Sequence, residues 1–240
     1  MPYFYYYWDP TYILILIGAV ISMIASARVR STYHKYARVH SMSGMTGQQT
    51  AEKILRMNGI HDVTIERVRG ELTDHYDPRN KVIRLSAGVY DSASVAAIGV
   101  AAHECGHVLQ HAGEYVPLKV RGALVPIVNF GSYASWFFIL AGLFWSGESS
   151  SMLIRIGIFL FSFAVLFQLV TLPVEFNASK RALKVLESGR ILREEELPDA
   201  KKVLGAAAMT YVAAVIAALL QMWRAIIIAG GRRGEYRDNQ

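Results

Sequence analysis

The sequence contains one cysteine, Cys105, among its 240 residues. A single cysteine excludes an internal disulfide, and it does not decide between an oxidising and a reducing compartment. Cys105 lies between two histidines in the sequence, but on a helix its side chain points away from both of them. We therefore expect Cys105 to fill a small buried space and to take no part in binding a metal.

Charged residues are scarce in four long stretches of the chain. Apolar residues make up 53% of the sequence, which indicates a membrane protein. Crossing a bilayer core about 30 Å thick takes about 20 apolar residues in a helix. The second and third stretches together contain one charged residue, Arg155. The last stretch contains Gln221 and Arg224. We predict membrane-spanning helices over residues 12–27, 124–145, 153–174 and 203–229.

Lysine and arginine are absent from residues 1–27, and the loop 146–152 has Glu148 as its one charged residue. The basic residues gather instead in residues 28–60 and 175–202. Because basic loops beside membrane spans stay in the cytoplasm, we expect the N-terminus outside and both basic regions in the cytoplasm. The net charge of +6 then reflects membrane topology, and we expect no nucleic-acid partner.

The C-terminal tail conflicts with this topology. Four spans that start outside also end outside, yet Arg232, Arg233 and Arg237 crowd the tail. Either residues 203–229 do not span fully, or the earlier basic regions set the orientation.

No basic residue precedes the first apolar stretch, which argues against a cleaved signal peptide there. Ala25-Ser26-Ala27 does resemble a cleavage site, but arginines follow it. The aromatic residues at positions 3–8 suit a membrane–water interface. We therefore predict an uncleaved membrane anchor.

The pentapeptide 103–107, His-Glu-Cys-Gly-His, follows the alanine-rich run 95–102, which predicts a buried helix. Residues four apart lie on one face of a helix. His103 and His107 can therefore hold one zinc ion, with Glu104 reaching the water bound to it. The other interpretation is a core helix with two hydrogen-bonded histidines, and it leaves the buried Glu104 without a reason.

A zinc hydrolase needs three protein ligands and one open position for water. A third histidine six residues after His107 is absent, because position 113 is glycine. The remaining candidates for the third ligand are His111, His75, Glu114 and Glu175. We favour Glu175, because it lies just past the third span, where an unpaired carboxylate would be costly. The alternative role of Glu175 is an ion pair with Lys180 or Arg181.

Between the first two spans the sequence predicts a small α+β unit. A polar, flexible stretch over 31–47 leads into a helix that begins at Thr46 or Gly47 and runs to Met57. Asp91 and Ser92 are candidate N-caps of the histidine helix. The unit also contains expected strands over 63–68 and 81–85, joined through a turn at 77–80.

The chain also resembles the bacterial neutral zinc metallopeptidase family of membrane proteins, the YugP-like group. The likeness covers most of the sequence and rests on 72–79 (LTDHYDPR), 84–86 (RLS), the HECGH pentapeptide and 175–182 (EFNASKRA). It implies zinc bound by His103, His107 and Glu175, with Glu104 as the catalytic base. It also implies a distant similarity to membrane gluzincins such as the CAAX prenyl proteases.

Those gluzincins have an aspartate four residues after the ligand glutamate, where this chain has Ser179. Such an aspartate orients a ligand histidine, and Asn177 and Asp74 are the candidates to replace it. Catalysis should also need a donor to the oxyanion; the candidates are His75, Tyr76 and Arg181. The strand Val82–Leu85 is a candidate free edge for an extended peptide, with ordinary core pairing as the alternative.

We therefore expect a mostly α membrane protein with a small α+β zincin-like catalytic unit. Its function would be a zinc metalloendopeptidase of the inner membrane that contacts lipids and cleaves proteins at the cytoplasmic face. The alternative is a non-catalytic zinc scaffold or partner-binding protein, although structural sites have four ligands and typically several cysteines. A transporter would need ionisable groups within the spans, where the second and third offer almost none.

The expected parts are an N-terminal transmembrane anchor (1–27), a zincin-like catalytic region (28–123), two transmembrane helices (124–174), a cytoplasmic helix with the third zinc ligand (175–202), and a C-terminal hydrophobic helix with a basic tail (203–240).

Overall fold

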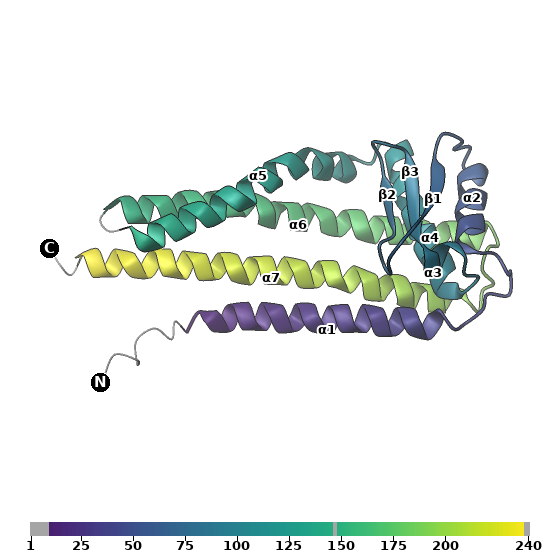
Figure 1. The fold of residues 1–240 in the computed structure, drawn as a ribbon, viewed down its shortest axis with the longest axis horizontal. Helices are drawn as coiled ribbons and strands as arrows, with labels where there is room; N and C mark the ends of the chain where they lie inside the picture. The colour runs from purple at the N-terminus through teal and green to yellow at the C-terminus, as the bar shows by residue number, and fades with distance from the viewer. Residues whose placement is uncertain (1–9, 146–147, 238–240) are drawn as a thin grey trace. The chain divides into compact units, whose positions relative to one another are not determined.

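The structure, a computed structural model, describes residues 10–145 and 148–237. Figure 1 shows their helices and strands in chain order. These are α1 (Tyr12–Tyr36), α2 (Gly47–Met57), β1 (Thr64–Val68), β2 (His75–Asp77), β3 (Val82–Ser86), α3 (Ala87–Tyr90), α4 (Val95–Ala112), α5 (Val116–Phe144), α6 (Glu148–Ser188) and α7 (Leu197–Arg237).

The protein is a mostly helical membrane protein, as the sequence predicts. Helices α1, α5, α6 and α7 are each long and apolar enough to cross a bilayer. The aromatic cluster at positions 3–8, expected at a membrane interface, lies outside the described residues. The fourth apolar stretch forms one continuous helix, so its length and composition allow a full span.

The chain divides into two compact units. Unit 1 consists of Met1–Ile24, Val120–Thr171 and Tyr211–Gln240, and unit 2 of Ala25–Lys119 and Leu172–Thr210. The four long helices run from one unit into the other. Unit 2 contains the sheet and the HECGH helix, together with the basic segments at 28–60 and 175–202.

Several helix boundaries differ from those expected. α1 continues to Tyr36 instead of ending near residue 27, because Tyr33 and Tyr36 lie on one face and are buried in the core of unit 2. α6 begins at Glu148 and shortens the expected loop 146–152. It also passes through Pro173 without ending, so the third span and the helix with Glu175 are one element.

The sheet has the strand order β1-β3-β2, with β3 parallel to β1 and antiparallel to β2. Of the two interpretations of Val82–Leu85, ordinary core pairing is confirmed and the free edge is wrong. β3 is the central strand, and its apolar residues are almost fully buried. β2 was not predicted, because it has only three residues and forms through the turn after Asp77.

Arg84 links all three strands through its guanidinium group. Its Nε donates to Glu66 on β1 at 3.2 Å, and its Nη1 donates to Asp77 on β2 at 3.1 Å. β2 itself packs against α4. The outer strand that packs on the HECGH helix is thus held by a hairpin and by a shared arginine.

The N-cap of α4 is Ser94, not Asp91 or Ser92. The Ser94 hydroxyl accepts a hydrogen bond from the backbone N–H of Ala97 at 3.2 Å. Asp91 instead follows the short helix α3, which the sequence did not predict. The expected start of α2 is confirmed, because Thr46 and Gln49 form a capping box there.

The core of unit 2 surrounds α4. Val95, Ile98 and Cys105 have no exposed surface and pack with residues of α2, β3, α6 and α7. The role of Cys105 as a small buried residue is confirmed. Burying a helix on most of its circumference fixes its rotation, so the two histidines of the motif take one defined direction.

In unit 1 the long helices approach through small residues. Gly18 of α1 lies against Ala217 of α7. The Ser135 hydroxyl of α5 donates to the carbonyl of Gly157 on α6 at 2.8 Å. Such close backbones and interhelical hydrogen bonds stabilise helix pairs in a membrane, where the hydrophobic effect between helices is absent.

Candidate metal centre

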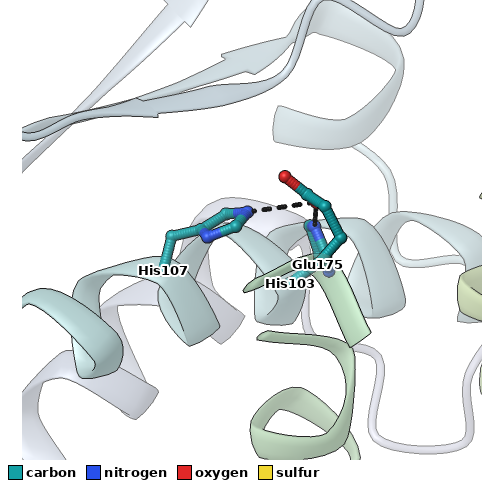
Figure 2. Close-up of side chains that lie close together, drawn as sticks. All are labelled: His103, His107 and Glu175. Carbon is teal, nitrogen blue, oxygen red and sulfur yellow. Dashed lines mark hydrogen bonds and ion pairs between the residues drawn. The ribbon is translucent and has the colours of Figure 1, made fainter. Parts of the chain in front are cut away.

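His103, His107 and Glu175 meet in unit 2. Glu175 Oε2 lies 3.3 Å from Nε2 of His103 and 3.5 Å from Nε2 of His107 (Figure 2). One potential ligand atom from each residue lies within 4.8 Å of the other two. The Glu175 side chain is 2% exposed, against 16% for His103 and 12% for His107. The donors therefore converge at a site that is almost closed on the Glu175 side and more open at the histidines.

The pairing of the two histidines follows from helical spacing. They are one turn apart on α4, and their ring centroids are 4.8 Å apart with the ring planes nearly perpendicular. Glu175 reaches them from α6 because position 106 of the motif is glycine. A Cβ atom at Gly106 would collide with the carbonyl oxygen of Ala178 on α6. Nothing in the sequence by itself explained this glycine.

The second nitrogen of each ring also has a partner. His103 Nδ1 lies 3.1 Å from the Ser179 hydroxyl, and His107 Nδ1 lies 3.0 Å from Oε1 of Gln110. These contacts hold both rings with Nε2 towards Glu175. Outer hydrogen bonds of this kind orient metal-binding histidines in proteins.

Neither of the two candidates to replace the missing aspartate contacts a ligand histidine. Ser179 itself contacts His103, so neither Asn177 nor Asp74 takes that place. Asn177 accepts a hydrogen bond from Gln110 instead, and Asp74 accepts from the backbone and hydroxyl of Ser86. Sequence reasoning missed Gln110, although its place three residues after His107 on one helix was a usable signal.

The negative charges around the site favour a cation. Burial alone would lower the pKa of His107, but the hydrogen bond with Glu175 and the charges of Glu104 and Glu175 outweigh burial and raise this pKa overall. The same field that stabilises a protonated imidazole also stabilises a metal ion beside it. Two imidazoles and one carboxylate are donors that zinc accepts, and three protein ligands leave its fourth position for water.

Glu104 follows His103 directly and lies three residues before His107, on the same turn of α4. The residue is 6% exposed. Within residues 10–145 and 148–237, no hydrogen bond or ion pair engages its carboxylate. The group therefore sits beside the histidines without a structural partner in the described part of the chain.

The other candidate ligands have different contacts. His111 Nδ1 lies 2.8 Å from the hydroxyl of Tyr76, and Glu114 pairs with Lys119 at 3.4 Å. The ring of His75 contacts the Thr73 carbonyl and Arg84. Among the described residues, Glu175 is thus the one candidate that joins the two histidines.

Arg181, a candidate oxyanion donor, contacts Asn177, a candidate to orient a ligand histidine. Arg181 Nε donates to Asn177 Oδ1 at 2.8 Å, and the guanidinium lies over the Tyr115 ring at 5.8 Å from its centroid. Asn177 leads from there to Gln110 and so to His107. Among the residues that the structure describes, Asn177 is therefore connected to His107 only through Gln110, and Arg181 only through Asn177 and Gln110.

The sequence matches the family described as "Putative neutral zinc metallopeptidase" over residues 11–230. The chain therefore belongs to this family of zinc metallopeptidases. It is also 46% identical over 225 residues to a Bacillus subtilis (strain 168) protein named "Putative membrane protease YugP", covering 93% of this chain and 99% of that protein. No solved structure matches the chain.

Proposed function

We propose that the protein is a membrane-embedded zinc metalloendopeptidase that cleaves peptide bonds of proteins at the cytoplasmic face of the inner membrane. The observation that carries the proposal is the meeting of His103, His107 and Glu175 on the turn of α4 that also carries Glu104. Membership of the zinc metallopeptidase family and the likeness to a membrane protease support it.

His103, His107 and Glu175 would hold the metal through two Nε2 atoms and a carboxylate oxygen. When bound, zinc lowers the pKa of a coordinated water towards 7 and polarises the substrate carbonyl. Glu104 accepts the proton of the attacking water and passes it to the leaving amine. Its position on α4 between the two histidines supports this role.

We propose β2 as the strand on which an extended substrate adds, in place of the central strand β3. β2 is an outer strand of the sheet and packs against α4. An outer strand has backbone N–H and C=O groups directed away from the sheet, and these bind a peptide in extended form. Tyr76 of β2 contacts His111 of α4, and we propose it as the oxyanion donor among the expected candidates.

The proposed orientation follows from charge. Both basic segments belong to unit 2, which also contains the metal-ligand candidates. Basic segments beside spans stay in the cytoplasm, so unit 2 faces the cytoplasm and the N-terminus lies outside. With four spans the C-terminus lies outside as well. A phosphatase or fluorescent reporter fused after Gln240 tests this, and a cytoplasmic reporter signal contradicts it.

Glu104→Gln tests the proposed reaction. Purified in detergent, the wild type and E104Q should bind zinc equally, and only the wild type should hydrolyse protein substrates. Comparative proteomics of membranes that contain either form would then identify the substrates. Retained hydrolysis in E104Q would refute the assigned base. A protein that holds zinc but never hydrolyses any substrate would favour the non-catalytic scaffold.

A further inference from the structure

We infer that Gln110 is a positioning residue that fixes the proton of His107 on Nδ1 and anchors α6 beside Glu175. The inference rests on the proposed zinc site. Gln110 has no exposed surface. Its Oε1 lies 3.0 Å from His107 Nδ1, and its Nε2 donates to the Val174 carbonyl at 2.7 Å and to Asn177 Oδ1 at 3.0 Å.

Two groups with a single hydrogen-bonding role determine which end of the Gln110 amide faces His107. The Nε–H of Arg181 can only donate, so the Asn177 atom that it contacts at 2.8 Å is the carbonyl oxygen. The backbone oxygen of Val174 can only accept. Gln110 therefore faces two acceptors on α6, and its NH2 group must point there.

With the NH2 group committed to α6, the oxygen of Gln110 faces His107. Nδ1 of His107 must then carry a proton, because two acceptors cannot share this contact. The lone pair of the neutral ring is left on Nε2, the atom that faces Glu175 at 3.5 Å. The acceptors of Val174 and Asn177 on α6 thus select the His107 tautomer that can bind a metal through Nε2.

His103 has no such constraint. Its Nδ1 contacts the Ser179 hydroxyl, which can donate or accept. The two histidines of the motif therefore differ in how firmly their tautomers are set. Ser179 is accordingly a matched control for Gln110, with the same kind of contact and no fixed direction.

The same amide also ties the two ligand-bearing helices together. Val174 directly precedes Glu175, so the Gln110–Val174 hydrogen bond holds α6 at the third donor while Oε1 holds the second. A glutamate at position 110 has almost the same shape, but ionised it has no proton to donate. It would face the Val174 and Asn177 oxygens with a negative charge.

The experiment measures zinc affinity by competition with a chelator, using full-length protein in detergent loaded with zinc alone. Gln110→Glu should weaken zinc binding about 10- to 100-fold, the range for outer hydrogen-bond partners of metal ligands. Arg181→Met alone should change affinity little, because the Val174 carbonyl still fixes the direction of the Gln110 amide. In the double variant, the Asn177 amide is free to rotate and donate to the carboxylate introduced at position 110, so Q110E/R181M should bind zinc more tightly than Q110E. Ser179→Ala should cost less than Q110E.

Two outcomes overturn the inference. One is a Q110E protein that binds zinc as the wild type does, and the other is a double variant in which the two losses simply add. A second measurement needs no variant at position 110: nitrogen-15 spectra of histidine-labelled, zinc-loaded wild type should show a proton on Nδ1 of His107, and a proton on Nε2 contradicts the inference. If the wild type binds no zinc, the proposed function itself fails, which separates the two failures.

Discussion

The backbone of Ala178 on α6 occupies the space where a side chain at Gly106 would be. A Cβ atom at position 106 would overlap the Ala178 carbonyl oxygen and lie 3.2 Å from the Ala178 Cα. Glycine costs a helix about 1 kcal/mol relative to alanine, and here that cost allows the two ligand-bearing helices to touch. The fourth residue of the HECGH motif is thus part of the reason that Glu175 reaches the histidines.

Gly106→Ala should therefore separate α6 from α4. We expect a loss of about 1–3 kcal/mol of stability from overpacking, reduced by the helix preference of alanine, and a weaker zinc site because Glu175 moves with α6. Chemical unfolding and chelator competition measure the two effects.

Gly99→Ala is the control on the same helix. Its Cβ would meet Ala200 at 3.9 Å or more, an ordinary contact, so we expect unchanged zinc binding and a stability equal to or up to about 1 kcal/mol above that of the wild type. Equal effects of the two substitutions would show that the contact with Ala178 does not matter.

Glu175→Gln should reduce zinc affinity more than any change in the outer hydrogen bonds, because it removes the charged donor itself. We expect a loss beyond the roughly 100-fold that outer partners can cause. Glu114→Gln changes an exposed acid of unit 2 that pairs with Lys119 and should leave affinity unchanged. Wild-type affinity in E175Q would remove Glu175 from the proposed ligand set.

The Cys105 thiol should resist alkylation in the folded protein. Burial raises its pKa strongly, with a further contribution from the charge of Glu104, so almost no reactive thiolate exists at neutral or mildly alkaline pH. As the only cysteine of the chain, it reports without interference. Mass spectrometry after maleimide treatment should show no label under native, mildly alkaline conditions and full labelling in denaturant. Rapid labelling of the native protein would contradict the burial of this face of α4.

Ser94→Ala tests the start of α4. Loss of the hydroxyl that accepts from Ala97 should cost about 1 kcal/mol of stability. Asp91→Ala removes an exposed ion pair with Arg67 and should cost well under about 1 kcal/mol. A larger loss of stability for Asp91→Ala than for Ser94→Ala would contradict Ser94 as the cap and favour Asp91, one of the two candidate caps from the sequence.

Sequence patterns predicted the features that depend on local spacing. The four apolar helices, the start of α2 at Thr46 or Gly47 and the placement of His103 and His107 on one helix face all follow from composition or helical periodicity. The contact of Glu175 with His103 spans 72 positions of the sequence. Glu175 was predicted as a ligand because an unpaired carboxylate beside a membrane span is costly, and because the chain resembles a zinc peptidase family. Features that depend on tertiary contacts were not predicted. β2 is too short to show a hydrophobic period, and Gly106 is needed because the backbone of Ala178 on α6 lies against it. The role of Gln110 depends on its hydrogen-bond partners on α6.

The most direct test of the central claim is X-ray absorption at the zinc edge of the purified, zinc-loaded protein, together with its zinc content. We predict one zinc per chain, with nitrogen and oxygen neighbours at about 2.0–2.2 Å, including imidazole scattering, and no sulfur. A sulfur neighbour at about 2.3 Å, or protein that retains no zinc, would contradict a centre built from His103, His107 and Glu175.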